Sequence, residues 1–387
     1  MTREAVIVDC ARSAFGKRKG ALADWHPTDL LGLVLRTIVE RNDLDPALID
    51  DVVGGCVTQA GEQGCNVTRN AWVAGGLPWQ VPATSVDRQC GSSQQAVHFV
   101  AQGVLAGAYD IAIACGVESM TRAPMSSNAR GGAGPFSGEF LTQTNNTLGI
   151  QFWVAQVLAD KWGISREEMD AYALQSHQRA AENTRNGFFA GEIVPVPVGE
   201  GRELSEDEGI RADASLEKIA SLGPAWESED QPAPNITAAN SSQMTDGAAA
   251  MIIASADFAE QHGLPVRARF HAFAVAAEDP VLVLSAPVPV TYKLMKRTGM
   301  TPDDWDAVEC NEAFAAIALM WQKEFGYPME RFNPRGGAIA LGHPLGASGV
   351  ALMTRLLRHL EATGGRYGFQ TMCEGGGQAN ATVIERV

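Results

Sequence analysis

The sequence has few basic residues, few aromatic residues and no long apolar run. Its 387 residues include 30 Lys and Arg against 45 Asp and Glu, which gives a formal charge of −15. A nucleic-acid-binding protein needs a basic face, so this balance disfavours that class. No apolar run approaches the roughly 20 residues that cross a bilayer, and no signal-peptide pattern opens the chain. We therefore expect neither a nucleic-acid partner nor a membrane partner.

Cysteine is also scarce, with seven widely scattered residues. An odd number without regular spacing is not typical of a disulfide framework, so we expect reduced thiols and a cytoplasmic protein. We also expect no bound metal. Glycine, by contrast, is abundant at 40 residues in a chain that is 45% hydrophobic. This composition predicts two large cores with closely packed helices and sheets.

Strands and helices alternate along the first part of the chain. Apolar residues at helical spacing predict helices over 28–41 and 96–105, and short apolar runs predict strands at 5–8, 51–53 and 110–114. This alternation predicts an α/β protein in which helices cover both faces of a mixed or parallel sheet.

The same order returns near the end of the chain. Asp50 and Asp306 each follow a Pro-led segment and open an apolar run. Cys90 lies 40 residues after Asp50, and His343 lies 37 residues after Asp306. We interpret the chain as two similar α/β halves in which Cys90 and His343 occupy equivalent strand-to-helix junctions. A chance likeness between β–α units is the alternative.

A central segment interrupts this order. It contains a Gly-rich stretch, a helical pattern near 165–185 and an acidic stretch at 199–234. We predict that it is an inserted loop domain that covers a ligand. The predicted domains are an N-terminal half of 1–118 plus 244–265, a loop domain of 119–243 and a C-terminal half of 266–387.

Cys90 is the candidate nucleophile. It precedes Gly91 and two serines at the predicted start of a helix, where unpaired N–H groups and the helix dipole favour a thiolate. An arbitrary cysteine is more often a small buried hydrophobe, and the other cysteines except Cys373 keep that interpretation.

His343 is the candidate base. It lies in Gly-His-Pro-Leu-Gly, where small neighbours allow close approach of a ligand. At the mirrored junction it could face Cys90 and take the thiol proton. Cys373 precedes three glycines whose turn would expose its thiol and backbone N–H groups, which could hold an oxyanion. Asn311 could position a water or an oxyanion, or it could merely cap a helix.

Taken together, these motifs resemble the thiolase family. Cys90-Gly91-Ser92, Asn311-Glu312-Ala313-Phe314, Gly342-His343-Pro344 and Cys373-Glu374-Gly375 match its four active-site motifs in order and spacing. The resemblance covers essentially the whole chain. It implies the thiolase fold, which is two similar halves in five layers (αβαβα) with an inserted loop domain over coenzyme A. It also implies a homodimer or homotetramer.

The resemblance implies ping-pong acyl transfer from a 3-ketoacyl-CoA, with coenzyme A as a substrate and no tightly bound cofactor. Cys90 would become acylated, and His343 would activate it. His343 and a water held by Asn311 would stabilise the enolate of the leaving acetyl-CoA. Cys373 would protonate that enolate and then deprotonate coenzyme A, while the N–H groups of Cys90 and Gly375 would hold the thioester oxyanion. The resemblance also implies these coenzyme A contacts: Arg211, Lys218, Trp226, Ala238, Ser242, Met244, Ala313 and Phe314.

Several positions depart from the common thiolase pattern. They include Ser93 and Gln94 beside the nucleophile and Arg335 near the His343 loop. We expect these polar residues to line the acyl site and to favour a bulky or oxygenated acyl group over acetoacetyl-CoA. The runs around Cys90 and Cys373 are similar to thiolases of bacterial steroid-ring breakdown.

Two other functions have to be weighed. A decarboxylating ketoacyl synthase would share the nucleophilic cysteine but would carry two His, or His and Asn, at the other catalytic positions. A catalytically dead, thiolase-like lipid-binding protein should lack at least one catalytic residue, and all four are present. Malonyl-dependent CO₂ release would identify the synthase. Inactivation by iodoacetamide with protection by acyl-CoA would exclude the binding protein.

Overall fold

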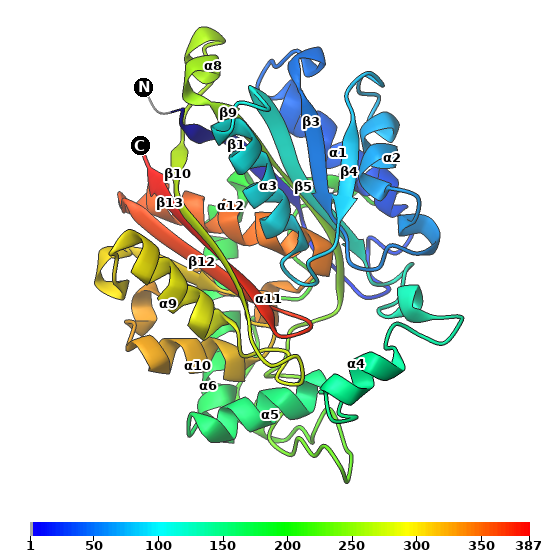
Figure 1. The fold of residues 1–387 in the computed structure, drawn as a ribbon, viewed down its shortest axis with the longest axis vertical. Coiled ribbons are helices and arrows are strands. Elements are labelled where there is room, and N and C mark those ends of the chain that lie inside the picture. Colours follow the sequence, from blue (N-terminus) through cyan, green and yellow to red (C-terminus); the bar gives the residue numbers. More distant parts are fainter. Residues whose placement is uncertain (1–2) are drawn as a thin grey trace.

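The strands of both halves join in a single sheet. The structure, a computed structural model, describes residues 3–387. Within them an 11-stranded sheet has the main order β11-β12-β13-β10-β1-β9-β5-β3-β4 (Figure 1). The bounds are β1 Ala5–Ser13, β3 Asp51–Gly55, β4 Ala83–Val86, β5 Ile111–Ser119, β9 Thr245–Ser255, β10 Ala268–Ala277, β11 Ala307–Cys310, β12 Tyr367–Glu374 and β13 Gln378–Arg386. The short strands are β2 Gly16–Lys17, β6 Ile193–Val194, β7 Val196–Pro197 and β8 Glu203–Leu204.

The two halves repeat one strand order. In the N-terminal half β5 pairs with β3 in parallel and with β9 antiparallel. In the C-terminal half β12 pairs with β11 in parallel and with β13 antiparallel. The halves meet through β1 and β10, which pair antiparallel at Val6↔Arg269 and Ile7↔Ala268. The predicted α/β fold of two similar halves is therefore confirmed.

Asp50 and Asp306 make equivalent hydrogen bonds in the two halves. A carboxylate oxygen of Asp50 accepts from the N–H groups of Asp110 and Ile111, at 2.6 and 3.2 Å. A carboxylate oxygen of Asp306 accepts from the N–H groups of Arg366 and Tyr367, at 2.6 and 2.9 Å. Each aspartate thus ties the entry of one parallel strand to the entry of its neighbour.

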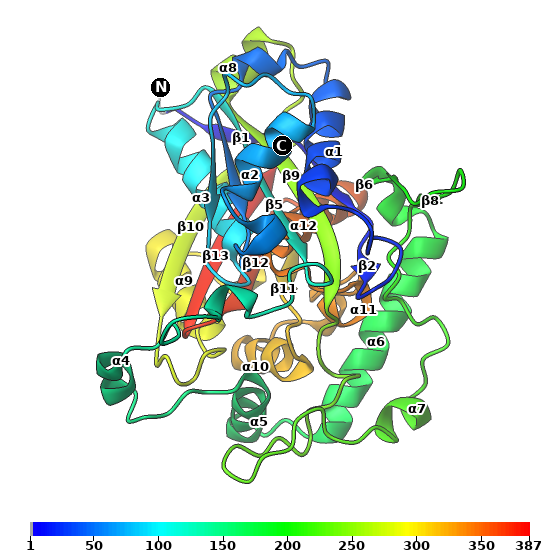
Figure 2. The same cartoon turned by 90° about the vertical axis from the view of Figure 1, so that its right-hand side faces the viewer.

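Helices form the outer and central layers. α1 and α2 pack on the N-terminal half, α9 and α10 belong to the C-terminal half, and α3 and α12 pack together between the halves (Figures 1 and 2). The helices are α1 Pro27–Glu40, α2 Val67–Ala74, α3 Ser92–Leu105, α4 Gly138–Gln143, α5 Gln151–Lys161, α6 Arg166–Arg185, α7 Leu216–Ala220, α8 Ala256–Gln261, α9 Pro287–Thr298, α10 Ala315–Phe325, α11 Ala338–Leu341 and α12 Leu345–Thr363. The 3₁₀ helices are η1 Pro46–Leu48, η2 Gly61–Gln63, η3 Ser127–Ala129, η4 Phe188–Gly191, η5 Pro302–Asp304 and η6 Met329–Arg331.

Glycine lets the two central helices approach closely. A Cβ on Gly349 of α12 would lie 2.2 Å from the backbone nitrogen of Gln94 in α3. A Cβ on Gly346 would lie 2.5 Å from the carbonyl oxygen of Val117 in β5. Any larger side chain would push α12 away from the sheet, so these glycines set the separation of the layers that hold Cys90 and His343.

The central segment wraps the C-terminal half. α5 and α6 pack against α10, and Val154 and Leu158 of α5 join the same buried cluster as Ile317 of α10. In both views α5 lies at the end of the molecule away from α8 (Figures 1 and 2). In residues 3–387 no helix is long and apolar enough to span a membrane.

Candidate active site

Cys90 sits on a strained turn between β4 and α3. The preceding residue, Gln89, has φ 49°, in the left-handed region that a non-glycine side chain disfavours. Cys90 is buried and packs with a small apolar cluster, whose other members are Val57, Met120, Leu345 and Met372. The turn therefore places the sulfur in a dry, apolar setting at the entrance of the helix.

This setting keeps Cys90 protonated. Burial raises the pKa of its thiol to about 12, and the carboxylate of Glu374 is the next cause. Glu118 and Asp87 add smaller effects in the same direction. Burial therefore works against the thiolate expected at the start of α3, because desolvation favours the neutral thiol. A base is needed to make the nucleophile.

His343 is held in one tautomer by Ser348. The Oγ of Ser348 lies 2.9 Å from the carbonyl oxygen of Pro344, which can only accept. Its single proton is used there, so the Nδ1–H of His343 donates to Ser348 Oγ across 2.6 Å. The Nε2 atom then carries a lone pair and accepts from the Nδ2 amide of Asn311 at 3.2 Å. Burial lowers the pKa of His343 to about 4, so the ring is neutral and able to take a proton.

Asn311 lies at the C-terminal end of β11 and is buried. Its Nδ2 group serves His343, and its Oδ1 atom is buried without a partner. An unpaired carboxamide oxygen is costly unless a ligand or a bound water uses it. The geometry thus joins Asn311 directly to His343, a contact that the sequence analysis does not predict, and leaves one acceptor that a bound water could use.

Cys373 lies inside β12 and is fully buried. Burial raises the pKa of its thiol well above the usual range, and Cys90 is the second cause, so the two thiols interact. The expectation that the glycine turn exposes this thiol is wrong. Cys373 still pairs with Ala379, so the strand continues through Glu374 and the turn begins only afterwards.

Gly375 brings the two cysteine segments together. A Cβ on Gly375 would lie 2.8 Å from the Oε1 atom of Gln89, the residue before Cys90. The turn then continues through Gly376 and Gly377, at φ 82° and 75°. The predicted oxyanion residue therefore lies beside the strained turn of the nucleophile.

Glu118 is a contributor that sequence reasoning missed. Its carboxylate accepts from the backbone N–H groups of Val57, Thr58 and Gly346 and from Nε2 of Gln63, at 2.9 to 3.0 Å. It ties a loop that borders Cys90 to the start of α12. The signal for Glu118 in the sequence is a single acidic residue within an otherwise apolar strand.

Sequence reasoning also missed Ser348, because nothing about a serine in a Gly-rich run indicates that it will bond to His343.

Four of the residues predicted to contact coenzyme A cluster around the Asn311 segment. The N–H of Ser242 donates to the carbonyl of Ala313 at 2.9 Å. Trp226 stacks on Phe152 with ring centroids 6.1 Å apart, and Phe152 meets Phe314 edge-on at 5.5 Å.

The other four are exposed and dispersed: Arg211, Lys218, Ala238 and Met244. Lys218 is already paired with Asp213 at 2.7 Å.

Ser93, Gln94 and Arg335 do not form a polar acyl site. Ser93 Oγ accepts from the N–H of Val350, and Gln94 bonds Thr382 and Gln370. The guanidinium of Arg335 donates to His359 and Asn183, and it lies 4.1 Å from the centre of the Phe188 ring. These polar groups are satisfied within the protein, so the expectation that they receive an oxygenated substrate is wrong.

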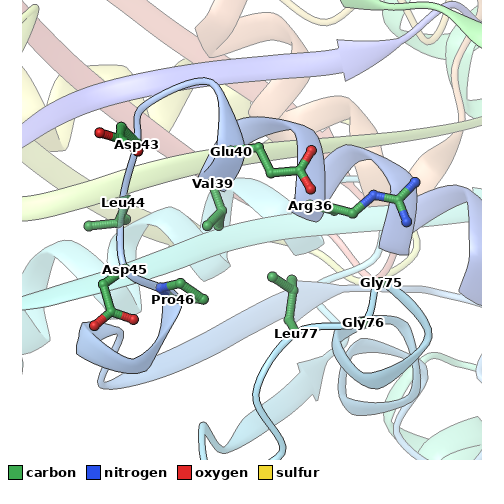
Figure 3. Close-up of a pocket in the computed structure, with 10 residues that line it drawn as sticks. All are labelled: Arg36, Val39, Glu40, Asp43, Leu44, Asp45, Pro46, Gly75, Gly76 and Leu77. Carbon is green, nitrogen blue, oxygen red and sulfur yellow. The ribbon is translucent and has the colours of Figure 1, made fainter.

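A surface hollow of about 530 Å³ lies elsewhere, beside α1 (Figure 3). Its lining includes Arg36, Glu40 and Leu77 and none of the residues predicted for catalysis or coenzyme A. Among residues 3–387 no cluster of His, Cys, Asp and Glu is arranged to hold a metal ion.

Comparisons with known proteins agree along the whole chain. Residues 5–257 match the family model described as the thiolase N-terminal domain, and residues 264–386 match the thiolase C-terminal domain. The chain is 46% identical over 391 residues to a steroid 3-ketoacyl-CoA thiolase of Mycobacterium tuberculosis, covering 99% of this chain and 94% of the relative. It is 40% identical over 407 residues to a beta-ketoadipyl-CoA thiolase of Acinetobacter baylyi, with full coverage of both.

A solved structure gives the same result. The acetyl-CoA acetyltransferase of Bacillus anthracis superposes with a TM-score of 0.89 at 31% identity, over 100% of this chain and 99% of that one. Fold and site together define an acyl-transferring enzyme built from two similar halves. The chain belongs to the thiolase family, and its reaction is thiolytic cleavage of a 3-ketoacyl-CoA.

Proposed function

We propose that Cys90 is the acyl acceptor in this reaction and that His343 and Cys373 move the protons. Nε2 of His343 takes the Cys90 proton, and the thiolate adds to the 3-keto carbon of the substrate. The C2–C3 bond then breaks, and Cys373 gives its proton to the acetyl-CoA enolate that leaves. Cys90 is left as an acyl thioester.

The second half-reaction returns each proton. The Cys373 thiolate takes the proton of incoming coenzyme A, whose sulfur attacks the acyl carbon. The Cys90 sulfur leaves and regains its proton from His343. The N–H groups of Cys90 and Gly375 hold the oxyanion, and Asn311 orients the His343 side. The observation that carries this scheme is the bond from Nδ1 of His343 to Ser348, which leaves Nε2 unprotonated. The bond from the Asn311 amide to Nε2 breaks when Nε2 takes the Cys90 proton.

The acyl group is apolar and bulky in our proposal, and a steroid-derived chain is the specific candidate. Val57, Met120, Leu345 and Met372 pack with Cys90 in a buried apolar cluster that includes two flexible methionines. The 46% identical relative is named for a steroid substrate. A thiolysis panel from four-carbon to polycyclic 3-ketoacyl-CoAs tests the proposal. The highest kcat/KM on acetoacetyl-CoA would contradict it.

Coenzyme A is the co-substrate, and we place it under the segment 119–243. The aromatic group of Phe152, Trp226 and Phe314 supports this placement. Titration calorimetry of coenzyme A against Trp226→Ala should show weaker binding than against the parent chain. Lys161, whose Nζ lies 4.5 Å from the Trp162 ring centre, provides a control substitution outside the predicted contacts. We further propose a homodimer or homotetramer, to be measured by light scattering.

A further inference from the structure

Glu374 is a buried acid between the two proposed catalytic cysteines. It follows Cys373 at the end of β12 and is fully buried. Its Oε1 atom lies 1.9 Å from the point that a Cβ on Gly91 would occupy. Gly91 directly follows Cys90 and is the N-cap of α3. The carboxyl group therefore fills the space that glycine leaves beside the nucleophile.

Within residues 3–387 this carboxyl group has no side-chain hydrogen-bond partner. Both Glu374 oxygens are buried without a well-formed hydrogen bond, and the backbone amide of Asn380 is the donor that comes near. The Oδ1 acceptor of Asn380 is also unpaired. Nδ2 of Asn380 is turned instead to the carbonyl of Gly91 at 3.3 Å. The region thus holds more buried acceptors than well-placed donors. A neutral carboxylic acid supplies a donor and avoids an isolated buried charge.

The electrostatics agree with that geometry. Burial raises the pKa of Glu374 to about 8, although Arg88 and the backbone amide of Asn380 offset part of the effect. The guanidinium of Arg88 is itself bonded to Gln378 at 2.9 Å. Glu374 in turn affects Cys90: among charged groups, its carboxylate raises the pKa of the Cys90 thiol most.

We propose that Glu374 is a positioning residue that holds a proton in the resting enzyme, and that its ionisation opposes formation of the Cys90 thiolate. The inference rests on the proposed role of Cys90 as nucleophile. While Glu374 is neutral, His343 can withdraw the Cys90 proton next to an uncharged neighbour. When Glu374 is ionised, the same step places two negative charges side by side in an apolar site.

Other titratable groups face the same place and have to be separated from Glu374. Glu118 approaches from β5, Asp87 from the turn before α3 and Cys373 from β12. Arg88 acts on Glu374 itself, and His343 is the proposed base. Glu118 accepts four hydrogen bonds and Asp87 accepts from Gln89. Among these carboxylates, Glu374 alone lacks a well-formed hydrogen bond within residues 3–387, so removing it isolates its effect.

The test is the rate at which iodoacetamide alkylates Cys90 as a function of pH, followed by peptide mapping. Wild type is compared with Glu374→Gln and Glu374→Leu, both of which remove the titrating proton. Below about pH 7 Glu374 is neutral in wild type, so the variants should react at nearly the wild-type rate. Above about pH 8.5 the variants should react faster, by about tenfold for each unit that the carboxylate adds to the Cys90 pKa.

Exposed Cys65 is an internal standard in the same samples, because its alkylation should be the same in all three proteins. Thermal unfolding shows whether each variant is folded, and the leucine variant serves if the buried amide of the glutamine variant prevents folding. A variant-to-wild-type ratio that stays constant with pH would overturn the inference while leaving Cys90 as nucleophile. Absence of Cys90 labelling in wild type would instead overturn the nucleophile assignment and, with it, this inference.

Discussion

The Oε2 atom of Glu118 accepts a hydrogen bond from the N–H of Gly346 across 2.9 Å. The same atom accepts from the N–H of Val57, also at 2.9 Å, and Val57 packs against Cys90. One buried oxygen therefore connects the start of α12, three residues after His343, to Val57, which packs against Cys90. The relative position of the proposed nucleophile, Cys90, and the proposed base, His343, therefore depends on Glu118.

Glu118→Gln should lower both stability and turnover. The glutamine NH₂ group would face N–H donors that the carboxylate now accepts. At least one of the four donors then loses its acceptor, which costs about 1–3 kcal/mol of folding free energy. Chemical denaturation measures the stability, and kcat with KM for the acyl-CoA measures the site. Glu62→Gln, at an exposed pair with Arg122, is the matched control and should change little. Unchanged kcat in a destabilised Glu118→Gln protein would restrict Glu118 to a structural role.

Ser348→Ala should lower kcat because the Nδ1–H of His343 loses its acceptor and the tautomer is no longer fixed. The loss should be smaller than for His343→Ala, since removal of a general base costs about 10²–10⁴ in rate. Steady-state thiolysis at several pH values measures both. Thr354→Val is the control, because its hydroxyl donates to the Val350 carbonyl in the same helix and also interacts with Cys10, away from the proposed catalytic residues. Equal kcat in Ser348→Ala and Thr354→Val would remove Ser348 from the mechanism.

Cys373→Ala should block turnover while Cys90 can still be alkylated and acylated. The two thiols act in different proton transfers, and loss of Cys373 leaves the enolate without its acid. Mass mapping after brief incubation with substrate should find the acyl group on Cys90 alone. Acylation at Cys373 in the parent chain would reverse the proposed roles.

Acidification should destabilise the fold through buried neutral histidines. Burial lowers the pKa of His98 to about 3, and Arg88 adds to the effect. The unfolded chain therefore binds more protons between about pH 6.5 and pH 3, and stability falls by about 1.4 kcal/mol per pH unit for such a group as pH decreases. Denaturation at pH 7.5, 6.0 and 5.0 measures the slope. His98→Gln should reduce it, and an unchanged slope would show that His98 charges without unfolding.

The sequence predicts the parts of the site that lie on repeated local patterns. Cys90 follows strand β4 and precedes α3, but His343 follows the short helix α11 and precedes α12. The prediction of a strand-to-helix junction at His343 is therefore wrong, and only the start of the following helix is equivalent in the two halves. The contacts of Glu118 and Glu374 could not be predicted, because their partners lie far along the chain, as with Glu118 and Gly346. Ser93 and Gln94 show the converse limit. A polar side chain beside a nucleophile can form hydrogen bonds with neighbouring helices and strands as readily as with a ligand. The sequence alone does not distinguish these two cases.

The duplicated architecture has a consequence for how the enzyme can fail. Cys90 precedes α3 in one half, whereas His343, Asn311 and Cys373 all belong to the other, and β1 and β10 join the halves through few paired residues. Neither half contains all four proposed catalytic residues. If the proposed site is right, turnover depends on how well the halves dock. A small shift of α3 against α12 is then expected to abolish turnover while the circular dichroism spectrum stays native.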